Sequence, residues 1–191
     1  METTILVGNA CILTNKNLGN KINEYDNVVR FNQFKLDGYV EDLGSKTTTI
    51  FYNHTTFISP SINLDKSKSL ILYNSRFKPC GIHVFNKLKK FNIHIKNLTL
   101  LNLYDKQITK IHKDLNYPKN KLFSTGFVAI VYYLFILKFS SITITNFDFQ
   151  SDPNNIEYFN HTAIKANIHC WSTEEKYANL WVSMGLIKFL Y

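Results

Sequence analysis

The first residues that suggest chemistry are a histidine and a glutamate five positions apart, His169 and Glu174. Ser172 and Glu175 have the S-x-x-E spacing of a capping box, so the sequence predicts that a helix begins at Ser172. His169 then lies on the preceding loop, where a solvent-accessible imidazole titrates near neutrality and can transfer protons. A single histidine is more often structural, and His161, eight positions upstream, is the rival for the same role.

A second feature is the segment Phe123-Ser124-Thr125-Gly126-Phe127, which leads into a run of apolar residues. A Ser-Thr-Gly turn that opens a helix presents hydroxyls, backbone N–H groups and the positive end of the helix dipole to an anion. The same turn is also an ordinary helix N-cap. The residues alone therefore fit either a phosphate site at Ser124, Thr125 and Gly126 or a structural cap.

Asparagines stand where three predicted strands end: Asn9, Asn32 and Asn53. Because ligands bind beyond the carboxyl ends of parallel strands, these side chains are placed to hydrogen-bond a base, a ribose or a phosphate. Gly8, just before Asn9, lets a ligand approach the backbone closely. In a chain rich in asparagine, turn and capping roles explain the same positions equally well.

The elements that position these residues alternate along the chain. Short apolar and β-branched runs predict strands, and several are apolar throughout, as in parallel sheets buried on both faces. The predicted strands are 4–7, 27–31, 47–52, 70–73, 98–103 and 141–145, and the predicted helices are 82–91, 105–115, 126–138 and 173–184. This alternation predicts an α/β fold, with a single Rossmann-like domain over residues 1–191 and a mostly parallel sheet flanked by helices. The polar stretch 151–166 is the predicted mobile loop of the site.

Composition and charge restrict the class of protein. With 45% hydrophobic and 15% aromatic residues, the chain can form a sizeable core, which excludes overall disorder. The net charge is +8 at pH 7, and Arg30 and Arg76 are the only arginines among 22 basic residues. Such a surface suits anionic lipids or phosphorylated substrates, whereas proteins that read duplex DNA rely more on arginine. We expect no nucleic-acid partner. The lysine excess fits either compositional drift on a solvated surface or a peripheral contact with a membrane surface.

The cysteines and the start of the chain bear on location. Cys11, Cys80 and Cys170 are odd in number and widely spaced, which favours reduced thiols over disulfides or a zinc site. The chain starts directly with a predicted strand, without the pattern of a secretion signal. No stretch reaches the roughly 18 apolar residues of a membrane span. These features predict a cytoplasmic protein of a bacterial or viral type.

Three blocks of the chain together resemble the motifs of the sialyltransferases. The large sialyl motif is matched by V-G-N at 7–9, D-x-V-V-R-F-N at 26–32 and E-D-x-G-S-K-T-T at 41–48. The small motif is matched at 123–127, and His169 with Glu174 has the H-x4-E spacing of the very small motif. Local similarity to the smaller bacterial sialyltransferases occurs at 32–34, 51–53 and 147–149.

The resemblance implies a GT-A-like variant fold and inverting transfer of sialic acid, or a related keto-sugar acid, from a CMP-sugar donor to a glycan hydroxyl. It implies that His169 is the base for the acceptor hydroxyl, with Glu174 and His161 in supporting roles. The implied donor-binding residues are Gly8, Asn9, Asn32, Asn53, Ser124, Thr125, Gly126 and Tyr158. No Asp-x-Asp motif occurs, so no catalytic metal and no cofactor beyond the donor are expected.

The chain departs from the eukaryotic pattern in two places. The cysteine pair that links the large and small motifs has no counterpart, and the aromatic motif at 157–160 lacks its leading histidine. Two other functions stay open: a transferase that uses another nucleotide sugar, and a non-catalytic protein that binds nucleotides or nucleic acid. The latter has no need for the H-x4-E spacing. The pattern specifies no oligomeric state.

Overall fold

A parallel sheet organises the molecule, and its strand order is β5-β4-β3-β2-β1-β6-β7 over the described residues. The computed structural model describes residues 2–10, 15–53, 69–74, 97–102, 106–149 and 168–191. The strands are β1 (Thr4–Val7), β2 (Asn27–Phe31), β3 (Thr49–Asn53), β4 (Ser69–Asn74), β5 (Asn97–Asn102), β6 (Ile142–Thr145) and β7 (Ile187–Phe189). Successive strands are added outward from β1 to β5, and β6 then pairs on the other side of β1. Such a switch in strand order opens a crevice at the carboxyl ends of the strands.

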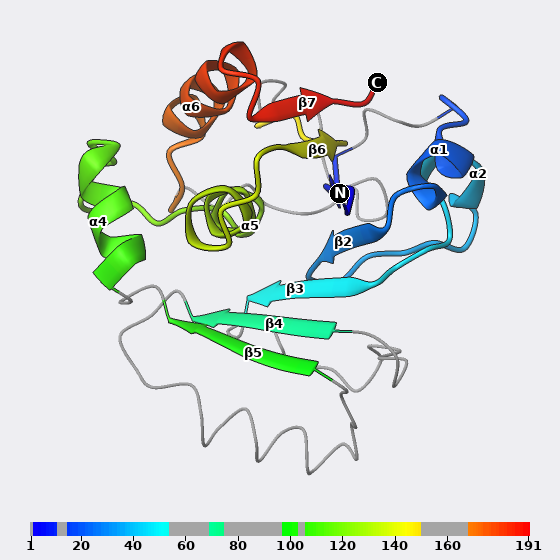
Figure 1. The fold of residues 1–191 in the computed structure, drawn as a ribbon, viewed down its shortest axis with the longest axis horizontal. Helices are drawn as coiled ribbons and strands as arrows, with labels where there is room; N and C mark the ends of the chain where they lie inside the picture. The colour runs from blue at the N-terminus through cyan, green and yellow to red at the C-terminus, as the bar shows by residue number, and fades with distance from the viewer. Residues whose placement is uncertain (1, 11–14, 54–68, 75–96, 103–105, 150–167) are drawn as a thin grey trace.

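Helices lie on both faces of this sheet (Figure 1). One face carries α1 (Gly19–Asn23) and α2 (Val40–Leu43), and the other carries α4 (Lys106–Asp114), α5 (Thr125–Val131) and α6 (Trp171–Ser183). A π-helical turn, η1 (Tyr132–Ile136), continues α5. Alternation along β1 separates the two cores, because Leu6 packs on the α5 side whereas Ile5 and Val7 pack with α1.

The predicted α/β fold with a parallel sheet is confirmed. The strands predicted at 4–7 and 27–31 are β1 and β2, and the ends of β3 to β6 differ from prediction by at most two residues. The predicted helix 126–138 is α5 followed by η1. Three short elements, α1, α2 and β7, were not expected, because none is long enough to show a periodic pattern. The predicted helix 82–91 and the predicted loop 151–166 lie outside the described residues.

The predicted capping box at Ser172 and Glu175 is wrong. The helix begins directly after Cys170, which occupies the N-cap position without a side-chain cap. The reason is tertiary: the Glu174 side chain is completely buried and bonded to another segment, so the first turn is fixed by those bonds. His169 nevertheless precedes the helix, as expected.

Two further observations concern the described helices and cysteines. None of the helices in the described ranges is long and apolar enough to cross a membrane. Cys170 is a free thiol. Cys11 and Cys80 lie outside the described residues.

Candidate active site

The ends of β1 and β6 meet in backbone contact at the switch point of the sheet. Gly8 donates its N–H to the carbonyl of Thr145 at 2.9 Å, and the Asn146 side chain donates to the Gly8 carbonyl at 3.1 Å. A Cβ on Gly8 would lie 2.3 Å from the Asn146 carbonyl oxygen. The sequence predicts close approach of a ligand here, and the structure shows that glycine is required for close approach of the neighbouring strand.

A closed ring of hydrogen bonds joins the ends of β2, β3 and β4 to the start of α5. Asn32 Nδ2 donates to Thr125 Oγ1 at 3.3 Å, and Asn32 Oδ1 accepts the backbone N–H of Asn53 at 2.8 Å. Asn53 Nδ2 donates to the Tyr73 hydroxyl at 3.1 Å, and that hydroxyl lies 3.3 Å from Thr125 Oγ1. Three predicted donor-binding residues therefore meet at one place, at the carboxyl end of the sheet.

Asn9 supports this ring from the end of β1. Its Nδ2 donates to the carbonyls of Phe31 at 3.3 Å and Gln33 at 3.2 Å, on either side of Asn32. Asn32 has a φ of 47°, a left-handed conformation that asparagine adopts more readily than most residues. Asn9 thus braces the turn that places Asn32.

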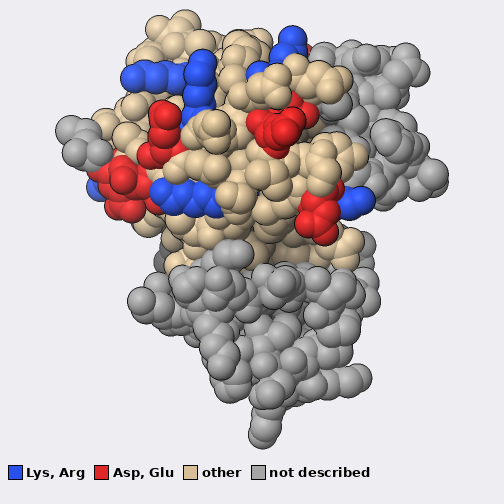
Figure 2. All heavy atoms as spheres, turned by 90° about the vertical axis from the view of Figure 1, so that its right-hand side faces the viewer, with Lys and Arg blue, Asp and Glu red and all other residues tan. Residues whose placement is uncertain are grey.

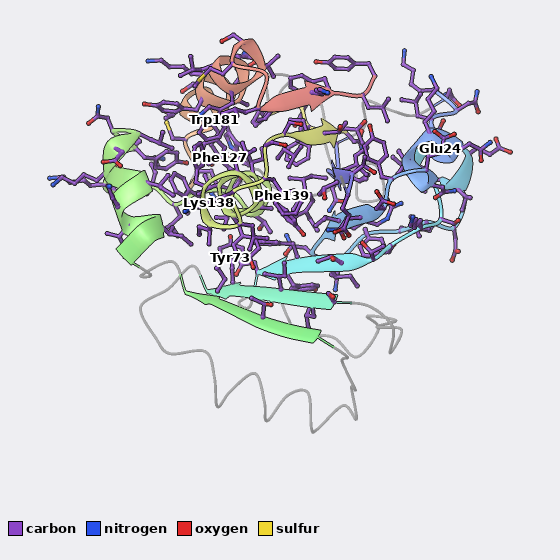
Figure 3. All side chains as sticks on the ribbon, in the orientation of Figure 1. Glu24, Tyr73, Phe127, Lys138, Phe139 and Trp181 are labelled. Atoms are coloured by element: carbon purple, nitrogen blue, oxygen red, sulfur yellow. The ribbon has the colours of Figure 1, made fainter. Side chains whose placement is uncertain are left out.

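Tyr73 is the member of the ring that sequence analysis missed. Its side chain is fully buried, and it lies below α5 in Figure 3. Burial raises the pKa of its hydroxyl above the ordinary value, so the group is neutral and can both donate and accept at pH 7. A tyrosine in a buried strand is expected in the core, and its partners Asn53 and Thr125 are 20 and 52 residues away. No local pattern reveals such contacts.

One buried carboxylate joins the small-motif segment to the very small-motif segment. Glu174 Oε1 accepts the Ser124 backbone N–H at 2.8 Å, and Glu174 Oε2 accepts the Ser124 hydroxyl at 2.6 Å. Burial raises the pKa of Glu174 to about 7, although the bonds from Ser124 act in the opposite direction. Ser124 is also the N-cap of α5, since its Oγ accepts the N–H of Phe127. The structure therefore gives this hydroxyl a different partner from the predicted phosphate.

Gly126 permits tight packing at the start of α5. A Cβ at this position would lie 2.5 Å from the Phe147 ring. That ring meets Phe31 edge-on, with 5.7 Å between centroids, so it cannot easily turn away. The glycine brings the first turn of α5 against the segment that follows β6.

His169 lies beside the segment that leads into α5. The N–H of Leu122 donates to the Ile168 carbonyl at 2.8 Å, and His169 Nδ1 lies 2.8 Å from the Leu122 carbonyl. Because a carbonyl only accepts, Nδ1 carries the hydrogen and Nε2 of the neutral ring keeps its lone pair. Burial lowers the pKa of His169, which favours the neutral ring at pH 7. This is the protonation state that a general base requires.

The buried charges of the block 26–48 serve the scaffold. The guanidinium of Arg30 donates to backbone carbonyls and one hydroxyl at the end of α2 and just after it: Leu43, Gly44, Lys46 and Thr47. The carboxylate of Asp42 accepts the backbone N–H groups of Asn15 and Asn17, both at 2.9 Å. These bonds fix the chain around α2.

Two predicted site residues, Tyr158 and His161, lie outside the described residues. Within the described part of the chain, no three His, Cys, Asp or Glu side chains form a group that could hold a metal ion.

Residues 1–183 match the family model of glycosyltransferase family 29 (sialyltransferase). The chain belongs to this family. It is 40% identical over 76 residues to the human type 2 lactosamine alpha-2,3-sialyltransferase, a match that covers 39% of this chain and 22% of that protein. It is 38% identical over 80 residues to the human CMP-N-acetylneuraminate-beta-galactosamide-alpha-2,3-sialyltransferase 4, covering 41% and 23%. The chain thus spans under a quarter of the length of these relatives.

A solved structure of a mammalian sialyltransferase in complex with Gal-beta-1-3GalNAc-ortho-nitrophenol has the same fold. It matches 99% of this chain and 69% of its own chain, with a TM-score of 0.76 and 21% identity. The predicted resemblance to sialyltransferases is therefore confirmed. The prediction of a bacterial or viral type is not supported, because these relatives are mammalian.

The three motif blocks of the family are connected to one another in the structure. The large-motif asparagines, the small-motif turn and the very small-motif histidine lie along one continuous set of contacts. Ser124 and Thr125 are its centre, since Ser124 bonds to Glu174 and Thr125 bonds to Asn32. A donor held at the asparagines would therefore lie near the loop that carries His169.

Proposed function

We propose that this chain transfers sialic acid, or a related keto-sugar acid, from a CMP-linked donor to a glycan hydroxyl with inversion. The observation that carries the proposal is the pair of bonds between Ser124 and Glu174, which joins two motif segments 50 residues apart. This junction sets the His169 loop beside the start of α5, next to the closed ring of hydrogen bonds at the ends of β2, β3 and β4.

The proposed reaction is a single displacement at the anomeric carbon of the donor sugar. Asn32, Asn53 and Thr125 hold the nucleotide part, and the first turn of α5 faces the phosphate with its N–H groups and positive dipole end. His169 Nε2 takes the proton of the acceptor hydroxyl while the acceptor oxygen bonds to the anomeric carbon. The bond from that carbon to the phosphate oxygen breaks, and CMP leaves with the electron pair.

The acceptor part of the proposal follows the relatives. Their names specify alpha-2,3 transfer to a type 2 lactosamine and to a beta-galactosamide. We propose a galactose-containing acceptor and an alpha-2,3 linkage for this chain. Incubation with CMP-sialic acid and a panel of lactosamine acceptors, followed by NMR of the product linkage, tests this part.

The central test compares His169→Ala with His161→Ala, each checked for folding. A general base contributes on the order of 10²–10⁴ in rate, so His169→Ala should lose turnover by about that factor. Its affinity for CMP should change less than about twofold, because the base meets the acceptor and not the nucleotide. An inactive His161→Ala with an active His169→Ala would assign the base to the other histidine.

The donor class and the absence of a catalytic metal are tested by binding and chelation. CMP should raise the melting temperature of the folded protein, whereas UMP and GMP should not, because only a ligand of the folded state stabilises it. We expect transfer to continue at an unchanged rate with EDTA. Stabilisation by UMP or GMP alone would contradict the proposed donor.

On one face of the molecule, the charge distribution differs from that of a nucleic-acid-binding surface. Figure 2 shows the face that bears α1 and α2, and on it the basic and acidic side chains are interspersed. Nucleic-acid-binding surfaces gather positive charge on one face or stripe. We keep a cytoplasmic location and a peripheral lysine-mediated membrane contact as proposals. Co-sedimentation with anionic vesicles tests the contact, and a disulfide at Cys170 in native protein would argue against the location.

A further inference from the structure

A tyrosine outside the three motifs lies where the small-motif and very small-motif segments meet. Tyr117, between α4 and α5, is 3% exposed. Its hydroxyl accepts the backbone N–H of Cys170 at 2.9 Å and lies 2.9 Å from Glu174 Oε1. It also lies 3.0 Å from the carbonyl oxygen of Leu122. Three residues, one from the segment before α5 and two from the start of α6, therefore contact one hydroxyl group.

Two of these contacts flank the imidazole of His169. The carbonyl of Leu122 is the group that lies 2.8 Å from His169 Nδ1, and Cys170 is the next residue in the chain. The hydroxyl thus accepts a hydrogen bond from the backbone beside the ring and lies against the carbonyl that bonds to the ring. It has a single hydrogen, so donation to Glu174 leaves the Leu122 carbonyl to His169.

The position of the hydroxyl is set by packing of the tyrosine ring. The ring meets Phe123 edge-on at 4.5 Å and His112 at 4.9 Å between centroids. Burial raises the pKa of Tyr117 above its ordinary value, so the hydroxyl keeps its hydrogen at neutral pH. The ring is held on several sides, so the hydroxyl is a rigid point of attachment for the His169 loop.

We propose that Tyr117 is a positioning residue that fixes the place and the tautomer of the His169 imidazole. This inference rests on the proposed function, in which His169 takes the proton of the acceptor. Donor binding does not depend on Tyr117, because both Ser124 bonds to Glu174 are made without it. The expected signature is a loss in kcat without a loss in donor affinity.

The test uses Tyr117→Phe, which keeps the ring and removes the hydroxyl. Tyr133→Phe is the matched control, because Tyr133 is also 3% exposed and its hydroxyl lies beside Thr49 and Asn27, away from His169. Since misplacement of a reacting group by about 1 Å costs up to about 100-fold, kcat of Tyr117→Phe should fall by about 10- to 100-fold. The donor KM should stay within about twofold of wild type. The control should keep both constants while losing a similar amount of thermal stability.

A second readout does not depend on turnover. Nitrogen-15 NMR of the histidine rings, with His169→Gln to assign the signal, should show the Nδ1–H tautomer in wild type and a mixture in Tyr117→Phe. Measurements at 10 °C with saturating CMP keep the variant folded. Wild-type kcat together with an unchanged tautomer in Tyr117→Phe would overturn the inference. Full activity of His169→Ala would instead overturn the proposed function, and the tautomer would still decide the role of Tyr117.

Discussion

Each end of the parallel sheet has a buried tyrosine whose hydroxyl lies beside one asparagine and one threonine. At the carboxyl end, Tyr73 lies beside Asn53 and Thr125. At the amino end, Tyr133 lies beside Asn27 and Thr49. At the amino end, the contacts connect β2 with β3, and Asn27 Oδ1 also accepts the hydroxyls of Thr48 and Thr49. These bonds hold neighbouring strands in register. At the carboxyl end, Thr125 belongs to the first turn of α5 and follows Ser124, which bonds to Glu174.

The difference between the two ends lies in what the same residue types connect. The amino end joins adjacent strands to the helical segment that packs on them. The carboxyl end joins strands to a helix start and, through Glu174, to the loop of His169. Position in a parallel sheet, and not residue type, therefore distinguishes a candidate site from a scaffold. Matched substitutions at the two ends test this conclusion.

A substitution that pushes the ends of β1 and β6 apart should have the largest effect on stability. Gly8→Ala places a Cβ 2.3 Å from the Asn146 carbonyl oxygen, which belongs to the backbone and cannot turn aside. We expect a loss of about 4 kcal/mol in the free energy of unfolding, measured in urea. Gly38→Ala is the control, since Gly38 has a φ of 84° with nothing within 4 Å of an added Cβ. Its backbone strain should cost about 1–2 kcal/mol. Equal losses would show that the contact between β1 and β6 is not tight.

The next effect concerns the pH dependence of stability at the Glu174 junction. Its pKa is about 7 in the folded protein, against an ordinary value of 4.5. Between these pH values the folded state keeps a proton that the unfolded state has lost, so stability falls as pH rises through this window. The fall should be on the order of 3 kcal/mol and should level off above pH 7.

Urea unfolding of wild type and Glu174→Gln from pH 4.5 to 8 measures this effect. The variant has no titrating group at this position, so its curve should lack the fall. His169, whose pKa is lowered by burial, contributes a rise in stability with pH in both proteins and cancels in the comparison. Parallel curves for the two proteins would mean that Glu174 ionises normally in the fold.

A smaller effect, on the affinity for CMP, should distinguish the two ends of the sheet. Asn32→Ala removes the bonds to Thr125 and to the Asn53 N–H, so the affinity for CMP should fall about tenfold. Asn27→Ala at the amino end should lower stability but leave CMP affinity within about twofold. Isothermal titration calorimetry of both variants measures this. A similar loss of affinity in both would place the effect in general stability.

The sequence allowed the fold and the main site segments to be predicted for identifiable reasons. Buried apolar runs defined β1 and β2 to the residue, and the three motif blocks pointed to the His169 loop and the turn at Ser124. The contacts that join these segments were not predictable, because the bond from Glu174 to Ser124 spans 50 residues and that to Tyr117 spans 57.

The errors have the same origin. The S-x-x-E pattern predicted a local cap at Ser172, whereas the buried side chain of Glu174 fixes the start of α6 through tertiary bonds. Tyr73 and Tyr117 have no local pattern that separates them from ordinary core residues. Local signals therefore identify the segments of this site, and packing determines how they are joined.

The smallest predicted effect tests the comparison most directly, because Tyr73→Phe and Tyr133→Phe remove one buried hydroxyl from each end. A neutral hydrogen bond contributes about 1 kcal/mol net, so both variants should lose a similar amount of stability. Only Tyr73→Phe should raise the donor KM, by about fivefold, because its hydroxyl holds the Asn53 and Thr125 side chains. Its kcat should change little, since the His169 ring bonds to the Leu122 carbonyl and the neighbouring Cys170 N–H bonds to Tyr117. If both variants left the donor KM unchanged, the closed ring of hydrogen bonds at the carboxyl end would serve only as a scaffold, as the contacts at the amino end do. Donor recognition would then have to rest on other groups.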